Sequence, residues 1–209
     1  MFDRLLFILL CRLSSRNYIC LPFLSLFRRN TRLIINGSGN HIVSLSKNIS
    51  HSTFELSGDN ITLDIKNGCN INGLTLVIKN EGGKPLRVSI GQNCSFEGGR
   101  ILIADSAGLS IGDNCIFSWG LNILTSDMHS ILDLETSDRI NNGKEIIIDD
   151  GVWCGINVSI MKGSKIPEGV VIGAGSVIRA NDLMCKSSIY SGNPIALIKK
   201  NIHWCRERL

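Results

Sequence analysis

Residues 148–182 read IDDGVWCGINVSIMKGSKIPEGVVIGAGSVIRAND, and an apolar residue recurs in this stretch at every sixth position. The apolar positions are Ile148, Cys154, Ile160, Ile166, Ile172 and Ile178. Four positions after each of them stand Val152, Val158, Ser164, Val170, Ser176 and Asp182, of which only the last is polar and large. Helices repeat apolar residues near 3.6 and strands near 2, so this period fits neither. It indicates a chain that turns a corner every six residues with one residue of each flat side inside, which is a three-sided β-solenoid with about 18 residues per coil.

The period continues before this stretch, with one interruption. Apolar residues at Ile111, Phe117 and Ile123 keep the spacing, and the pattern then stops until Ile148. We therefore expect residues 129–145 to form an excursion loop out of the solenoid wall. Long loops within compact domains are uncommon and often functional.

Three segments follow from this organisation. Residues 33–192 are predicted to form the solenoid domain, loosely repeated over 33–110 and regular afterwards. Residues 193–209 are predicted to form a helix, because Asn193 can cap it and a proline suits its first turn. Residues 1–32 are predicted to form a helical cap over the open end of the solenoid.

The net charge of +4 is concentrated in the cap segment. Residues 1–32 hold six arginines and one aspartate, a net of +5, so residues 33–209 sum to −1 and nucleic acid is not expected as a partner. The longest uncharged run of this segment, 17–27, has 11 residues and is too short to span a bilayer. Two readings stay open: a cap alone, or a cap that also makes peripheral contact with the anionic inner face of the inner membrane.

The eight cysteines do not indicate a disulfide framework. Cys69, Cys94 and Cys115 follow similar stems and take the small inward position that valine or serine takes elsewhere. No C-x-x-C pair is present, which argues against a zinc site. We expect reduced thiols and a cytoplasmic location.

Five motifs occur in order along the second half of the chain. They are Asp127-Met128-His129-Ser130, Arg139-Ile140-Asn141, Gly151-Val152-Trp153-Cys154-Gly155, Ile172-Gly173-Ala174-Gly175-Ser176-Val177 and Ser191-Gly192-Asn193-Pro194. Over roughly the last 100 residues the chain resembles the hexapeptide-repeat acyltransferases, and among them the bacterial polysaccharide O-acetyltransferases that acetylate sialic acid in capsules. The resemblance implies an all-β, left-handed parallel β-helix, whereas the usual rule for parallel crossovers would favour the right hand.

The resemblance implies transfer of an acetyl group from acetyl-CoA to a hydroxyl of a surface polysaccharide sugar, directly and with no acyl-enzyme. A thioester is already activated, so no metal is required. Imidazole suits the general base, and His129 is the one histidine of four that opens the excursion loop; a loop histidine bonded to backbone is the alternative. Asp127, two residues earlier, could hold the imidazole tautomer or could be a polar corner residue.

The remaining site residues are expected to line the substrate pocket. Trp153 points away from the core next to a glycine, and by resemblance it lines the pocket beside the histidine; packing in a trimer is the alternative. Gly155, Ala174 and Gly175 expose backbone along which the pantetheine arm can lie, although corner geometry alone also explains them. Lys199 and Lys200 are candidates for the coenzyme phosphates, or simply face solvent.

A single solenoid offers only a flat wall, and the resemblance implies a homotrimer with sites between subunits. Two other functions stay open. The same solenoid serves N-acetyltransferases of amino-sugar nucleotides, although no nucleotide-binding groove can be named here. A purely structural solenoid would have no use for a loop that carries a single histidine.

Overall fold

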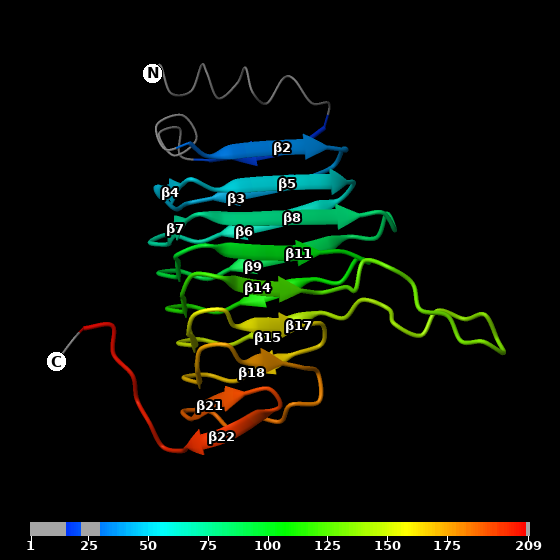
Figure 1. Cartoon of the computed structure of the whole chain (residues 1–209). Helices are drawn as coiled ribbons and strands as arrows, with labels where there is room; N and C mark the ends of the chain where they lie inside the picture. The colour runs from blue at the N-terminus through cyan, green and yellow to red at the C-terminus, as the bar shows by residue number, and fades with distance from the viewer. Residues whose placement is uncertain (1–15, 22–29, 208–209) are drawn as a thin grey trace.

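The computed structural model describes residues 16–21 and 30–207, and within them the chain is all-β, with no helix. Its parallel strands stack into a three-sided tube, drawn with the N-terminal end at the top of Figure 1. The predicted fold class is therefore confirmed.

Each side of the tube is one sheet. Sheet A contains β1 (Tyr18–Cys20), β3 (His41–Ser44), β6 (Ile61–Ile65), β9 (Leu86–Ile90), β12 (Leu109–Ile111), β15 (Ile146–Ile148) and β18 (Lys165–Ile166). Sheet B contains β2 (Arg32–Asn36), β5 (Thr53–Gly58), β8 (Leu74–Asn80), β11 (Gly99–Ile103), β14 (Leu121–Leu124), β17 (Ser159–Met161) and β20 (Val177–Ile178). Sheet C contains β4 (Asn48–Ser50), β7 (Asn70–Asn72), β10 (Ser95–Phe96), β13 (Ile116–Phe117), β16 (Trp153–Cys154), β19 (Val171–Ile172), β21 (Ile189–Gly192) and β22 (Ile195–Lys199).

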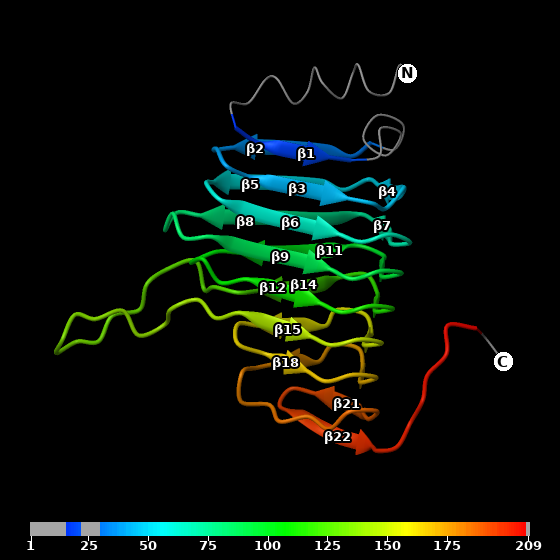
Figure 2. The same cartoon turned by 180° about the vertical axis from the view of Figure 1, so that it is seen from behind.

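The coil is left-handed. In Figure 1 the strands of sheet B run left to right across the front, and the chain then passes behind and descends. Figure 2, seen from behind, shows β3, β6 and β9 again running left to right, which is right to left in Figure 1. A path that turns in this sense while it descends is a left-handed screw, as the resemblance implied.

The six-residue pattern marks the core. All six apolar positions from Ile148 to Ile178 are 0–1% exposed, and so are the five small positions from Val152 to Ser176. Cys69, Cys94 and Cys115 are buried at the corner between sheets A and C, where each thiol lies within hydrogen-bonding distance of a backbone carbonyl of the next coil. These predictions for the inward positions are confirmed.

The helix predicted over residues 193–209 is wrong. Residues Ile195–Lys199 form β22, which turns back at Asn193-Pro194 and pairs antiparallel with β21. The last strand of a sheet offers unpaired backbone groups, and pairing with them outweighs the local preference for a helix. The chain then continues as a tail, residues 200–207, that runs back along the outside of sheet C in Figure 1.

The predicted cap, residues 1–32, differs at its described end. Residues Tyr18–Cys20 form β1, which pairs in parallel with β3, so this part of the segment is solenoid wall. Residues 1–15 and 22–29, on which the rest of the cap prediction and the membrane contact depend, lie outside the described residues. Over the described ranges, no helix has the length and apolar character to cross a membrane.

Candidate active site

The excursion loop leaves the tube between β14 and β15 and projects far to one side in Figure 1, as predicted. Its outer part is an antiparallel pair, with a bridge between Leu132 and Arg139 and a bond from the Ile140 amide to the Ile131 carbonyl. The Asp133 carboxylate accepts bonds from the amides of Glu135 and Thr136, which close the tip turn and lower the pKa of Asp133. The loop thus has structure of its own.

The two ends of the loop are joined by one amide side chain. Asn141 Nδ2 donates to Asp127 Oδ2 and to the carbonyl oxygen of His129, both at 2.8 Å. Asn141 Oδ1 accepts from the Ile131 amide at 2.8 Å and from Arg139 Nε at 3.2 Å. The side chain is 8% exposed, so these bonds satisfy a buried amide completely.

Asp105, the second residue after β11, ties the loop to the coil above. The Arg139 guanidinium donates to both of its carboxylate oxygens, at 3.1 and 2.7 Å, and Ser126 Oγ donates at 2.6 Å. The bond from Arg139, helped by Ser126 and the Gly143 amide, holds the pKa of Asp105 below its usual value. A bidentate pair of this kind fixes orientation as well as distance.

Asp127 is held by a lysine of the coil below. Lys162 Nζ donates to Asp127 Oδ2 at 2.5 Å and to the Asn141 carbonyl at 2.8 Å, and the first bond lowers the pKa of Asp127. The strand ends at Leu124, and Met128 has a φ of +64°, so Asp127 and His129 do not share a strand face as expected. The carboxylate is engaged by Lys162 and Asn141 in this chain.

His129 is exposed at the root of the loop. Its backbone carbonyl is fixed by Asn141, and the imidazole makes no hydrogen bond or ion pair within the described residues. The alternative of a histidine whose ring is bonded to backbone is therefore not what the structure contains.

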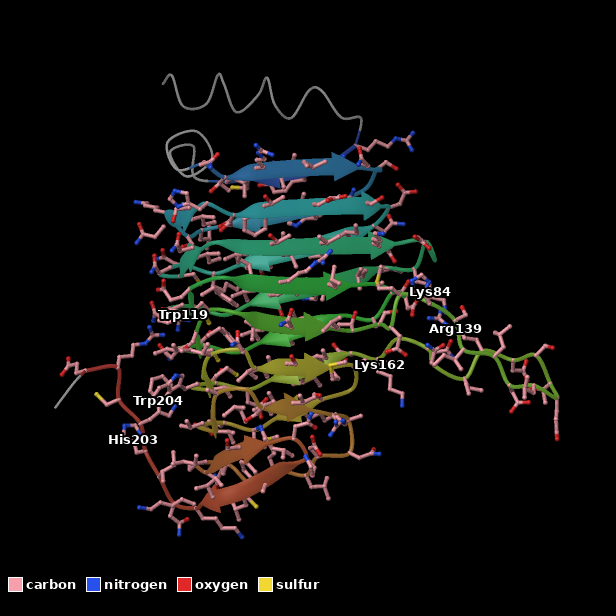
Figure 3. The ribbon with its side chains drawn as sticks, viewed as in Figure 1. Lys84, Trp119, Arg139, Lys162, His203 and Trp204 are labelled. Atoms are coloured by element: carbon pink, nitrogen blue, oxygen red, sulfur yellow. The ribbon has the colours of Figure 1, made fainter. Side chains whose placement is uncertain are left out.

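Trp153 lies on sheet C, away from the loop. Its side chain is 39% exposed, and its ring lies 5.9 Å from that of Trp204 in the tail, measured between centroids. In Figure 3, Trp204 and Lys162 lie at opposite edges of the tube. Trp153 packs on Trp204 at one edge, whereas Asn141, which Lys162 holds at the other edge, fixes the His129 backbone. One chain therefore does not bring Trp153 and His129 together.

Gly155, Ala174 and Gly175 lie together at the corner that follows sheet C. The Gly155 amide donates to the Ile172 carbonyl at 2.8 Å, and a Cβ added to Gly155 would lie 2.9 Å from the Ala174 nitrogen. Gly175 has a φ of +70° with open space around it. Corner geometry therefore accounts for both glycines, and the exposed Ala174 leaves the adjacent backbone accessible.

Lys199 and Lys200 are both exposed, at the end of β22 and just after it rather than on a helix. The tail beyond them was not foreseen as part of a site. Trp204 Nε1 donates to the Gly151 carbonyl at 2.6 Å, and the Arg206 guanidinium donates to Ser95 Oγ at 2.7 Å and to the Asn93 carbonyl at 2.6 Å. A groove between the tail and the solenoid is lined by Asp150, Glu168, His203, Trp204 and Arg206.

An apolar row on the outside of sheet B was also missed. Val77, Leu102, Leu124 and Met161 are paired in register on successive strands, and they point outward because their neighbours in sequence fill the core. The sequence did contain a signal for this row. Along a strand with one face in the core, outward positions are normally polar, and on these strands they are apolar.

Asp105, Asn141 and Lys162 hold the ends of the excursion loop against the solenoid, and no role was predicted for them from sequence. Leu124 pairs with Met161 in register, so the residues that follow them share a corner. The six-residue pattern, which stacks Ile123 on Ile160, therefore contained the signal that places Lys162 beside the root of the loop.

A left-handed coil of parallel strands with an ejected loop is the fold that the resemblance to the hexapeptide-repeat acyltransferases implied. No family model matches the chain. The polysialic acid O-acetyltransferase of Neisseria meningitidis is 35% identical over 134 residues, which are 64% of this chain and 60% of the relative. The polysialic acid O-acetyltransferase of Escherichia coli O1:K1 / APEC is 34% identical over 124 residues, 59% of this chain and 39% of the relative.

Among solved structures, the polysialic acid O-acetyltransferase OatWY matches with a TM-score of 0.72 and 28% identity, over 94% of this chain and 93% of that chain. These two relatives and this solved structure are thus all named as polysialic acid O-acetyltransferases. The matched segment spans 60% and 39% of the length of the two curated relatives.

Proposed function

We propose that this protein is an acyltransferase that moves an acetyl group from acetyl-CoA to a hydroxyl of a capsule or lipopolysaccharide sugar. The observation that carries the proposal is the exposed His129 at the root of a loop that the solenoid holds in place through Asn141, Arg139 and Lys162. The names of the homologues support a sialic acid polymer as the acceptor.

His129 is the general base of the proposed reaction. Its imidazole takes the proton of the acceptor hydroxyl as the hydroxyl oxygen attacks the thioester carbonyl, and it returns the proton to the departing coenzyme thiolate. The transfer is direct, with no acyl-enzyme. Cys69, Cys94, Cys115 and Cys154 are buried, which keeps these thiols from serving as a nucleophile. No step requires a metal.

The site is proposed to lie between subunits of a homotrimer. In one chain Lys162 and Trp204 lie at opposite edges of the tube in Figure 3; His129 is tied to the first through Asn141, and Trp153 packs on the second. The tryptophan that faces an imidazole therefore comes from a neighbouring copy. The apolar row on sheet B supports this, because its half-buried members Leu102, Leu124 and Met161 run past the root of the loop and would be covered by that copy. Trp153, Gly155, Ala174 and Gly175 then line the donor groove, with Lys199 and Lys200 as candidates for the coenzyme phosphates. The location remains proposed as cytoplasmic, at or near the inner membrane.

The test is a transfer assay with acetyl-CoA and three acceptor sets: sialic acid polymers, lipopolysaccharide oligosaccharides and amino-sugar nucleotides, read by the mass gain of one acetyl group. We expect transfer to a saccharide hydroxyl, and we expect His129→Ala to lower turnover about 10² to 10⁴-fold while the protein stays folded. His51→Ala, which alters an exposed histidine of the early coils, should keep turnover near that of the wild type. Wild-type turnover in His129→Ala, or transfer only to the amine of a sugar nucleotide, would overturn the proposal.

A further inference from the structure

We propose that Asn141 is the positioning residue for His129: its side-chain amide fixes the backbone that carries the imidazole, and it acts on transfer only through that histidine. The inference rests on the proposed function of His129. Asn141 lies 12 positions beyond His129, at the other end of the loop.

The backbone before His129 needs external support. Met128 has a φ of +64°, a left-handed conformation that costs roughly 1 kcal/mol or more for a residue with a side chain. Within the turn, only the bond from the Met128 amide to Ser126 Oγ, at 3.0 Å, compensates this cost. Bonds from outside the turn therefore decide whether His129 keeps its place.

Asn141 supplies these bonds on both sides of His129. Its Nδ2 holds the His129 carbonyl, and its Oδ1 holds the Ile131 amide, each at 2.8 Å. The backbone is thus gripped at His129 itself and two residues later. An amide suits this pair of contacts, since it carries its donors and its acceptor on two separate atoms of the same short side chain.

Asn141 is itself held from two directions. Lys162 Nζ donates to its backbone carbonyl at 2.8 Å, and Arg139 Nε donates to its Oδ1 at 3.2 Å. Arg139 is fixed in turn by Asp105, and both basic residues lie at the loop edge of the tube in Figure 3. The rigid coils above and below the loop therefore set the position of the amide, and through it the position of the imidazole.

Asn142 provides a matched control. It is the adjacent asparagine, it is exposed, and its side chain makes no hydrogen bond in the described part of the chain. Asn141→Ala and Asn142→Ala thus remove the same side chain at neighbouring positions, and they differ in whether the loop backbone loses its bonds.

The experiment is a double-mutant cycle on the full-length chain. We expect Asn141→Ala to lower kcat about 10²-fold with the KM for acetyl-CoA unchanged, because a small displacement of a catalytic group costs about that much. In the His129→Ala background, the same substitution should leave the residual rate unchanged. Hydrogen exchange at the Ile131 amide should accelerate in Asn141→Ala and stay slow in Asn142→Ala.

Two outcomes would overturn the inference. One is a kcat in Asn141→Ala within two-fold of that in Asn142→Ala. The other is an equal fold loss in the wild-type and His129→Ala backgrounds, which would mean that Asn141 acts independently of the imidazole. A failure of the proposed function looks different, since the wild-type chain would then transfer no acetyl group to any saccharide although its Ile131 amide exchanges slowly.

Discussion

At the scale of single residues, burial separates six of the described cysteines into two chemical groups. Cys154 is fully buried, and desolvation raises the pKa of its thiol to about 12. The hydrogen bond with Cys115, together with burial, raises the pKa of Cys94 to about 12 as well. Cys185 and Cys205 are exposed.

This difference predicts selective alkylation. Iodoacetamide reacts with thiolates, and at pH 8 a thiol with a pKa near 12 is almost wholly protonated. We expect Cys185 and Cys205 to be labelled in the native protein, and Cys69, Cys94, Cys115 and Cys154 only after guanidinium unfolding, as mapped by peptide mass spectrometry. Rapid labelling of Cys154 in the folded protein would contradict the assigned packing.

The partners of single residues were the least predictable part of the site. Asp127 was expected to orient the His129 ring, yet its carboxylate is bonded to Lys162, which lies 35 positions later and one coil below. The period of six reveals which residues point inward. It does not predict which partner a corner side chain such as Asp127 will contact, because the excursion loop moves the residues at its two ends away from the regular path of the coil.

At the scale of elements, the corner glycines decide how closely the coils stack. Gly155 lies directly above Ala174 of the next coil, and its missing side chain leaves room for the Ala174 nitrogen and the Ile172 carbonyl. Gly82 is different, since the one near atom is the hydroxyl of Ser106, which can move.

We therefore expect Gly155→Ala to destabilise the fold and Gly82→Ala to change it little. Overpacking against backbone costs about 1 to 3 kcal/mol, which lowers Tm by about 3 to 10 °C in a chain of this size. Thermal melts followed by circular dichroism measure both variants. An unchanged Tm in Gly155→Ala, with a raised KM for acetyl-CoA, would assign the glycine to ligand binding alone.

Elements within the repeat could be predicted and terminal elements could not. The inward residues from Ile148 to Ile178 could be predicted from sequence because each makes the same contact as its neighbour one coil away. For Ile195–Lys199, a capping asparagine and a proline indicated a helix, but the free edge of β21 selected a strand. An exposed edge is a property of the assembled sheet, which no local window of sequence contains.

At the scale of the whole molecule, the proposed shared site predicts complementation. In a trimer that mixes His129→Ala and Trp153→Ala chains, one of the three interfaces pairs a wild-type histidine with a wild-type tryptophan. If each parent variant has lost most of its activity, random mixing in equal amounts should restore about a quarter of wild-type activity.

The measurement is the transfer rate after the two variants are unfolded together and refolded, with separately refolded variants as the control. Restoration places the two residues in one site across an interface. If mixed trimers form but stay as inactive as their parents, the two residues do not meet between subunits.

The tail gives this solenoid a property that stacked coils alone lack. Each coil touches only its neighbours, so a simple repeat array can fray from its end one unit at a time. Here the Arg206 guanidinium donates hydrogen bonds to Ser95 Oγ and to the Cys115 carbonyl, 111 and 91 positions earlier in the chain. Trp204 Nε1 donates to the carbonyl of Gly151, which lies in the sequence between those two residues and the C-terminal hairpin. If the tail leaves with the final coil, bonds in the middle of the tube break as well, and we expect this half of the molecule to melt as one cooperative unit.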